Sequence, residues 1–251
     1  MANTKASRSA EGIAGMRAIE TLKPEADRII SDPYARALIP GGIMFSISRW
    51  IIKSGLYELI APGAVAFIIG RERCIDDYLK ACLSAGFDTR AYRIPGIERT
   101  RVFEIGLNTQ QLGEVLRSGG YDEQGRTLFI WQGVIYFLKP EGVDSTLAFI
   151  AHHSGPDSAV IFDYIYNETL HDTTQGYGKA LARAGKVSGE PYVFGIDKGQ
   201  VGPFLAQRGF WDVLDTPLED VKSKYFTGPN AARAMVTGHI AIASARVCRA
   251  G

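Results

Sequence analysis

The chain has 251 residues, 46% of them hydrophobic, which is enough for one sizeable core or one core with a small cap. Its 28 basic and 27 acidic residues give a net charge of +1 and form no basic stripe, so the charge argues against a nucleic-acid partner. No stretch reaches the roughly 20 apolar residues of a membrane span, and the polar N-terminus lacks an apolar secretory core. Three scattered cysteines, with no CxxC and no Cys/His cluster, predict reduced thiols in a cytoplasmic protein without a zinc site.

The N-terminal part of the chain predicts a series of helices. One runs from Ala10 to Pro24 and carries Arg17, for which a solvated helix charge is the alternative to a ligand contact. Asp32 is suited to cap a helix that begins at Pro33. Residues 43–59 are apolar and aromatic, which fits either a buried helix or a lid over a substrate pocket.

The next predicted helix begins near two arginines. Arg71 and Arg73 lie at its start, where a cation opposes the helix dipole and therefore calls for a partner. Asp76 or Asp77 could supply a local ion pair, and a ligand carboxylate is the other candidate. The pattern leaves both open.

The most informative stretch is the small-residue turn at residues 84–93, followed by a short apolar run at residues 101–105. Ser84, Ala85 and Gly86 carry almost no side-chain bulk, so a ligand could lie against bare backbone there. Asp88 can bond local amides, and Glu104 lies near the end of the apolar run. A small-residue turn followed by a strand that ends in an acid is the general plan of a nucleotide-binding α/β fold.

Strands and helices alternate in the C-terminal half, which predicts a mostly parallel sheet. Residues 127–131 and 159–164 are near-continuous apolar runs, as expected of strands buried on both faces. Since ligands lie beyond the carboxyl ends of such strands, Gln132, Gly133 and Tyr136 are expected near a site. Residues 167–186 predict a helix or lid.

Six ordered motifs together resemble the leucine carboxyl methyltransferase-like family of S-adenosylmethionine-dependent O-methyltransferases. They are Met16-Arg17-Ala18-Ile19-Glu20, Ser31-Asp32-Pro33-Tyr34-Ala35, Arg71-Glu72-Arg73-Cys74-Ile75-Asp76-Asp77, Ala85-Gly86-Phe87-Asp88-Thr89-Arg90-Ala91-Tyr92-Arg93, Val102-Phe103-Glu104-Ile105 and Phe129-Ile130-Trp131-Gln132-Gly133-Val134. The resemblance implies a class I methyltransferase, a Rossmann-like α/β fold. We expect one domain over residues 1–251, with a helical cap at 1–70 and an α/β core at 71–251.

The resemblance also implies a cofactor, S-adenosylmethionine, and the residues that bind it. Arg71 would hold the methionine carboxylate, with Arg17 or Arg73 as a second cation. The backbone at Ser84, Ala85 and Gly86 would approach the methionine and ribose, and Asp88 would hold the turn or contact the cofactor. Glu104 would accept the ribose hydroxyls. Gln132 and Tyr136 would line the sulfonium end.

The sequence departs from the family at places that matter for this site. Ser84 stands where the family has a glycine, Gly106 stands where it has an aspartate, and Gln132 replaces a common glutamate. One or two strands of the family's sheet are missing, before Ser84 and after Ile105. A parallel sheet without a central strand leaves backbone groups unpaired unless another segment fills the place. A homo-oligomer is therefore one expectation.

Two functions follow from these observations. The first is methyl transfer from S-adenosylmethionine to a carboxylate or hydroxyl of a small molecule or peptide. No dedicated base stands out, which favours a carboxylate or an acidic hydroxyl because neither needs strong deprotonation. The second is a non-catalytic family member that binds a ligand or partner. A nicotinamide-dependent oxidoreductase is a third and weaker hypothesis, since the Gly-x-Gly spacing is broken.

Overall fold

The computed structural model describes residues 8–39, 42–85, 87, 112–174 and 176–248. The chain divides into two compact units, one formed by residues 1–76 and 217–238 and the other by residues 77–216 and 239–251. Each unit is considered by itself below. The organisation into one domain with a cap at 1–70 stays a prediction.

The first unit is helical and joins the N-terminal segment to a later part of the chain. It contains α1 (Arg8–Thr21), η1 (Ala35–Leu38), α2 (Gly42–Lys53), α3 (Leu56–Ile60), the first part of α4 (Ala64–Ser84), α10 (Leu218–Tyr225) and η5 (Gly228–Asn230). A small core of Ala18, Ile19, Ala35 and Phe45 holds α1, η1 and α2 together. Gly70 of α4 lies against Val221 and Phe226, so close that a Cβ atom there would meet them at 2.9 and 3.1 Å.

The predicted helix at residues 43–59 is interrupted. Gly55 has φ +78°, a left-handed conformation that ends α2 and separates it from α3. The buried-helix interpretation is wrong for most of this segment, because Ile47, Trp50 and Leu59 are 46%, 63% and 80% exposed. Tyr34, and not Asp32 as predicted, takes the N-cap position of the next helix, although Oδ1 of Asp32 accepts bonds from the Tyr34 and Ala35 amides at 3.0 Å. That helix is the short 3-10 turn η1, which begins at Ala35 instead of Pro33.

A buried carboxylate connects α1 to the later segment of this unit. Glu20 is 2% exposed and forms ion pairs with Lys23 at 2.9 Å and Arg233 at 3.0 Å, while its Oε1 also accepts the Ile29 amide at 3.1 Å. Burial raises the pKa of Glu20, but the bonds to Lys23, Arg233 and Ile29 outweigh it and leave the pKa below its ordinary value.

Replacing Glu20 by glutamine is expected to lower the free energy of unfolding by about 1–3 kcal/mol at neutral pH, because charge-assisted bonds to two cations are lost. Since the folded-state pKa is depressed, the stabilisation is present above the ordinary carboxyl pKa and disappears as the pH falls through the folded value. The difference between the two proteins, measured by chemical denaturation, should therefore shrink below about pH 4. Glu25→Gln is the matched control, since Glu25 is 91% exposed. A pH-independent difference would contradict this account.

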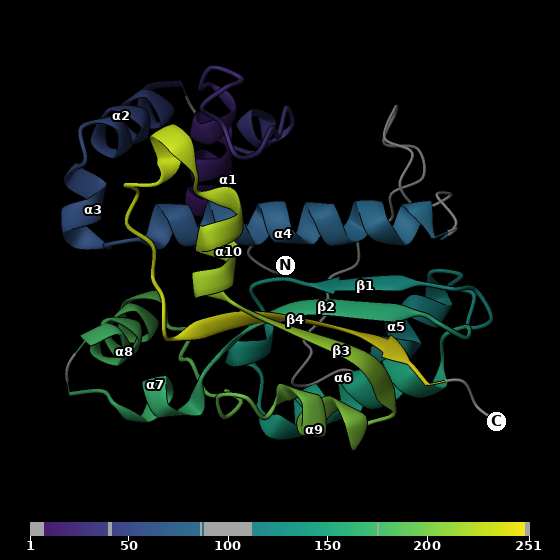
Figure 1. Ribbon diagram of the computed structural model, residues 1–251. Helices are drawn as coiled ribbons and strands as arrows, with labels where there is room; N and C mark the ends of the chain where they lie inside the picture. The colour runs from purple at the N-terminus through teal and green to yellow at the C-terminus, as the bar shows by residue number, and fades with distance from the viewer. Residues whose placement is uncertain (1–7, 40–41, 86, 88–111, 175, 249–251) are drawn as a thin grey trace, which may run out of the picture. The chain divides into compact units, whose positions relative to one another are not determined.

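The second unit is built on a four-stranded sheet with the order β1-β2-β4-β3 (Figure 1). The strands are β1 (Leu128–Trp131), β2 (Ala159–Ile165), β3 (Phe210–Pro217, of which 210–216 belong to this unit) and β4 (Ile240–Val247). β1 and β2 are parallel, with Leu128 opposite Ala159, and β2 and β4 are antiparallel. All seven residues of β2 are buried, as their apolar run predicted.

Helices surround this sheet. They are the last turns of α4, α5 (Leu112–Ser118), α6 (Pro140–His152), α7 (Asn167–His171), α8 (Gly176–Ser188) and α9 (Val201–Ala206), with the 3-10 turn η4 (Ile135–Phe137) between β1 and α6. Figure 1 shows α6 and α9 on the same side of the sheet. Arg208, just after α9, pairs with Asp144 of α6 at 2.8 Å. The sequence predicted a helix or lid over residues 167–186, where the structure has α7 and α8.

The part of the chain that the structure describes contains neither a membrane-spanning helix nor a metal-binding group of side chains. None of its helices is long and apolar enough to cross a membrane. Its His, Cys, Asp and Glu side chains form no group of three that could hold a metal ion.

Candidate functional site

The carboxyl ends of β1 and β2 are joined by one buried hydrogen bond. The Gly133 amide donates to Oδ1 of Asp163 at 2.6 Å, and Asp163 is fully buried in β2. Gly133 has φ +71°, a conformation that glycine adopts without strain. This bond fixes the turn that carries Gln132 beyond the end of the sheet, where ligands lie in parallel α/β folds.

Replacing Asp163 by alanine is expected to lower the free energy of unfolding by about 1–3 kcal/mol, because the Gly133 amide loses its acceptor. Asp163→Asn keeps an acceptor oxygen of the same size and should cost clearly less. Chemical denaturation of the two variants measures the difference. Equal losses would show that the negative charge, and not the acceptor, holds the turn.

An aromatic cluster follows the same end of β1. The Tyr136 ring lies 4.7 Å from the Phe137 ring and 5.3 Å from the Tyr192 ring, measured between centroids. The Tyr136 carbonyl accepts bonds from the amides of Val193 at 2.8 Å and Phe194 at 3.2 Å. The segment around Tyr192 is thereby held beside the end of β1. The electron-rich faces of tyrosine rings attract cations.

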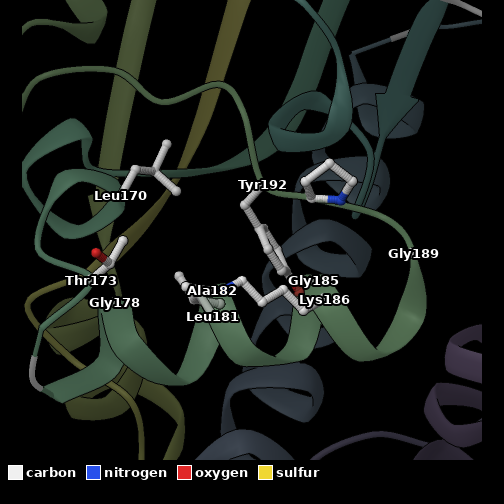
Figure 2. Close-up of a pocket in the computed structure, with 10 residues that line it drawn as sticks. Leu170, Thr173, Gly178, Leu181, Ala182, Gly185, Lys186, Gly189 and Tyr192 are labelled. Atoms are coloured by element: carbon white, nitrogen blue, oxygen red, sulfur yellow. The ribbon is translucent and has the colours of Figure 1, made fainter.

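A cavity of about 420 Å³ lies next to this cluster (Figure 2). Tyr192 belongs to both, since it lines the cavity and contacts Tyr136 and Phe137. In Figure 2 the Tyr192 side chain reaches down toward α8, while Leu170 and Thr173 approach from α7 and its C-terminal end. The lining residues are Leu170, Thr173, Gly178, Leu181, Ala182, Gly185, Lys186, Gly189, Pro191 and Tyr192.

Two glycines of α8 let its neighbours come close enough to enclose this cavity. A Cβ atom at Gly178 would collide with the carbonyl oxygens of Thr169 and Asp172, so only glycine allows α8 to begin directly against α7. A Cβ atom at Gly185 would lie 3.1 Å from Cα of Pro191. Gly178 and Gly185, which lie in the segment predicted as a helix or lid, are therefore packing positions in the structure.

Two groups of this unit that could take a proton from a substrate, Tyr164 and His153, are held by other side chains. Burial, then the charge of Asp215 and the bond to it at 2.9 Å, raises the pKa of the Tyr164 phenol far above its ordinary value, so Tyr164 stays protonated. His153 bonds Glu123 at 2.9 Å and stacks on Phe149. Of the residues that line the cavity, none is a histidine, cysteine or carboxylate.

Arg17 has partners within the first unit. Its guanidinium pairs with Asp32 at 2.6 Å and with Glu72 at 2.7 Å. Arg17 is thus neither a freely solvated charge nor an open cation, and a ligand carboxylate would have to share it with two acids.

The other two predicted arginines differ in their surroundings. Arg73 donates to the Ile29 carbonyl at 3.0 Å and lies over the Tyr225 ring at 5.3 Å. Arg71 is 2% exposed, with its guanidinium 5.1 Å from the Phe67 ring centroid. Arg71 is thus the most deeply buried of the three predicted arginines.

The structure does not bring Ser84 and Ala85 together with Gln132 and Tyr136. α4 runs through Ser84, whose hydroxyl bonds the Lys80 carbonyl, and Arg126 bonds the Ala85 carbonyl at 3.1 Å. Cys82 and Phe87 pack against Ala159 and Leu128, which are the first residues of β2 and β1. The turn therefore begins at the amino ends of these strands, whereas Gln132 and Tyr136 follow a carboxyl end.

The physical reason is the strand that the sequence lacks before Ser84. In a nucleotide-binding α/β fold such a strand carries the chain across the sheet, from the end of a helix to the edge where ligands lie. Here α4 extends through Ser84, and no strand lies between this helix and Ser84. Ser84 and Ala85 lie at the C-terminal end of α4, and the approach of their backbone to a ligand stays a prediction.

Three predicted residues, Gly86, Asp88 and Glu104, lie outside the described part of the chain. Sequence analysis also missed two residues of the site. Asp163 had a signal, since an acid in an otherwise apolar buried strand needs a hydrogen-bond donor. Tyr192 had none, because its contact with Tyr136 spans a long separation in the sequence.

Comparison with known proteins shows the family to which the chain belongs. The family model described as leucine carboxyl methyltransferase matches residues 10–108 and 105–151, together more than half of the chain. A protein of Mycolicibacterium smegmatis named "Putative S-adenosyl-L-methionine-dependent methyltransferase" is 25% identical over 260 residues, covering 85% of this chain and 84% of that protein. A second one from the same organism is 27% identical over 264 residues, covering 86% and 87%. Among solved structures, the apo methyltransferase SibL has a TM-score of 0.37 at 16% identity, over 98% of this chain and 71% of that chain.

The alignment with the first of these relatives shows how many aligned positions have no residue in this chain. This alignment spans 260 positions, whereas 85% of 251 residues is about 213, so about 47 aligned positions have no residue in this chain. The family match is itself split into two pieces that meet at residues 105–108. This is the place after Ile105 where the sequence motifs predicted a missing helix and strand.

Proposed function

Because the chain belongs to the leucine carboxyl methyltransferase family, we propose that it transfers a methyl group from S-adenosylmethionine to an oxygen atom of a small molecule or peptide. Methyltransferase activity and the methyl donor come with the family, whose match over more than half of the chain is the observation that carries the proposal. The oxygen acceptor is proposed because the described residues that line the cavity include no histidine, cysteine or carboxylate.

The described residues suit the two charged ends of this cofactor. A buried arginine such as Arg71 matches a carboxylate, which it can bind through two parallel hydrogen bonds. The aromatic cluster of Tyr136, Phe137 and Tyr192 offers ring faces to a sulfonium cation. We assign the methionine carboxylate to Arg71, with Arg17 or Arg73 as a second cation, and the sulfonium end to Gln132 and Tyr136. Glu104 is assigned to the ribose hydroxyls from the family motif.

For methyl transfer the protein has to align the acceptor with the methyl group of the cofactor more than it has to move a proton. S-adenosylmethionine supplies a methyl group that its sulfonium already activates. The acceptor oxygen must lie in line with the bond that breaks, away from water. The Asp163–Gly133 bond holds the turn next to Gln132, and contacts with Phe137 and Tyr192 hold Tyr136, which supports the assignment of both residues to the sulfonium end. A carboxylate acceptor attacks in its ionised form, so no residue has to remove a proton.

The proposal is tested by incubating the protein with S-adenosylmethionine and a panel of carboxylic acids, phenols and alcohols, and measuring S-adenosylhomocysteine. Release that depends on an added acid, with the methyl ester as product, is the expected result. Release with amines alone would contradict an oxygen acceptor.

A second candidate function is ligand or partner binding without catalysis. It is favoured by the separation of Ser84 and Ala85 from Gln132 and Tyr136, and by the missing aligned positions. In the described sheet β1 pairs only with β2, so association of two copies through this edge is part of the same candidate. Methyl transfer to any acceptor would remove the non-catalytic candidate, and sedimentation would report the association.

A further inference from the structure

We propose that a second cavity, between α5, β1 and α6, binds an uncharged aromatic molecule that carries a carbonyl group or a similar hydrogen-bond acceptor. The cavity has a volume of about 320 Å³, at the lower end of the range for small-molecule sites. Of the described residues assigned to the cofactor, none lines it, although the lining residue Trp131 directly precedes Gln132. The ligand is therefore distinct from the methyl donor, and its binding does not depend on methyl transfer.

One hydrogen-bond donor in the lining of this cavity lacks a partner. The indole N–H of Trp131 is buried and makes no hydrogen bond, and the residue as a whole is 7% exposed. A buried N–H group without a partner costs free energy, so native proteins rarely leave one. The other donors of the described lining are engaged, since the Thr127 and Thr146 hydroxyls donate to backbone carbonyls at 3.1 and 2.8 Å and the Tyr121 hydroxyl donates to Thr127 Oγ1 at 3.5 Å. Because an indole can only donate, the group that satisfies Trp131 must be an acceptor.

The rest of the lining selects an uncharged molecule with a ring. Leu112 and Leu116 of α5 and Ile150 of α6 are apolar, and the described lining contains no charged side chain, so a charged ligand would lose its hydration without gaining a partner. Burial raises the pKa of the Tyr121 phenol, which therefore stays uncharged at neutral pH. The Tyr121 and Phe129 rings, 6.1 Å apart, both line the cavity and can pack against a third ring. Water suits such a cavity poorly, because it needs several polar partners.

Two contacts hold the walls of this cavity in place. A Cβ atom at Gly113 would lie 2.8 Å from the Phe149 ring, so α5 and α6 meet there directly. The Trp131 ring packs edge-on against Phe162 of β2, with the centroids 6.2 Å apart. The walls thus pack against their neighbours without a ligand, and the indole is held at the cavity before one binds.

Three probes of similar size test this site. Acetophenone and α-methylstyrene have the same shape, but only acetophenone carries an acceptor, and benzoate adds a charge. In ¹⁵N-labelled protein each of the three tryptophans gives one indole N–H signal, and Trp131→Phe identifies that of Trp131. Acetophenone should shift the Trp131 signal in a saturable way and leave those of Trp50 and Trp211 in place. Its affinity should exceed that of α-methylstyrene and of benzoate by about fivefold or more, because only acetophenone satisfies the indole without bringing a charge.

Variants of α5 and β1 locate the binding. Leu116→Phe enlarges a lining side chain and should weaken acetophenone binding by roughly tenfold or more. Val115→Phe, on the same helix but not among the described lining residues, is the matched control and should bind as the wild type does. Trp131→Phe should lose the preference for acetophenone over α-methylstyrene, and the comparison of the probes on the wild-type protein decides the matter if this variant does not fold. Equal affinities of the wild type for these two probes would overturn the inference, as would a Trp131 signal that does not move at millimolar acetophenone.

Discussion

Replacement of Arg71 by alanine is expected to weaken S-adenosylmethionine binding by well over tenfold. Hydrogen bonds to charged groups are worth about 1.5–3 kcal/mol, which corresponds to roughly 10- to 150-fold in affinity. Arg71 is 2% exposed, so little water is available to replace the guanidinium as a partner of the methionine carboxylate. Titration calorimetry of the variant against the wild-type protein measures the loss.

Two further variants make this result interpretable. Arg71→Lys keeps the charge but not the planar fork, so its affinity should lie between those of wild type and Arg71→Ala. Arg183→Ala removes an exposed arginine of α8 and should bind as the wild type does. Melting curves without cofactor show whether Arg71→Ala is folded, and Arg71→Lys stands in for it if it is not. Unchanged affinity in a folded Arg71 variant would mean that the methionine carboxylate is bound elsewhere.

Replacement of Glu104 by alanine is the second change with a large expected effect on cofactor binding. The family motif assigns its carboxylate to both ribose hydroxyls, so two charge-assisted hydrogen bonds would be lost and the affinity should fall well over tenfold. The same titration measures it, with Glu114→Ala, an exposed acid of α5, as the control. Glu104→Gln keeps one acceptor oxygen and should show an intermediate loss.

An unaltered affinity in Glu104→Ala would remove the ribose assignment. Together with unaltered affinity in Arg71→Ala it would remove the whole proposed site. A loss in Glu104→Ala of equal size to that in Glu114→Ala would point to general destabilisation instead of ribose binding.

The local features of the fold could be predicted from the sequence because they depend on nearby residues. The apolar run at 159–164 predicted the fully buried strand β2, and Asp32 was expected to bond nearby amides, as it does at Tyr34 and Ala35. The prediction of one continuous helix at residues 43–59 was wrong because of a single local residue. Gly55 adopts a left-handed conformation and divides a helix that hydrophobicity alone would continue.

The site was harder to predict because it depends on which end of the sheet each turn reaches. The motif at Ser84 and Ala85 matches the family locally, yet its place follows from the strand that is missing before it. The Asp163–Gly133 bond and the Tyr136–Tyr192 contact join residues 30 and 56 positions apart, so a local sequence pattern cannot predict which residues are partners. Gly178 was visible, but only the nearby carbonyl oxygens of α7 show why it must be glycine.

Calorimetric titration of the unmodified protein with S-adenosylmethionine tests the central claim most directly. The account predicts saturable binding of one cofactor per chain and a rise in melting temperature with cofactor concentration. No heat and no shift of the melting temperature at millimolar S-adenosylmethionine would contradict it.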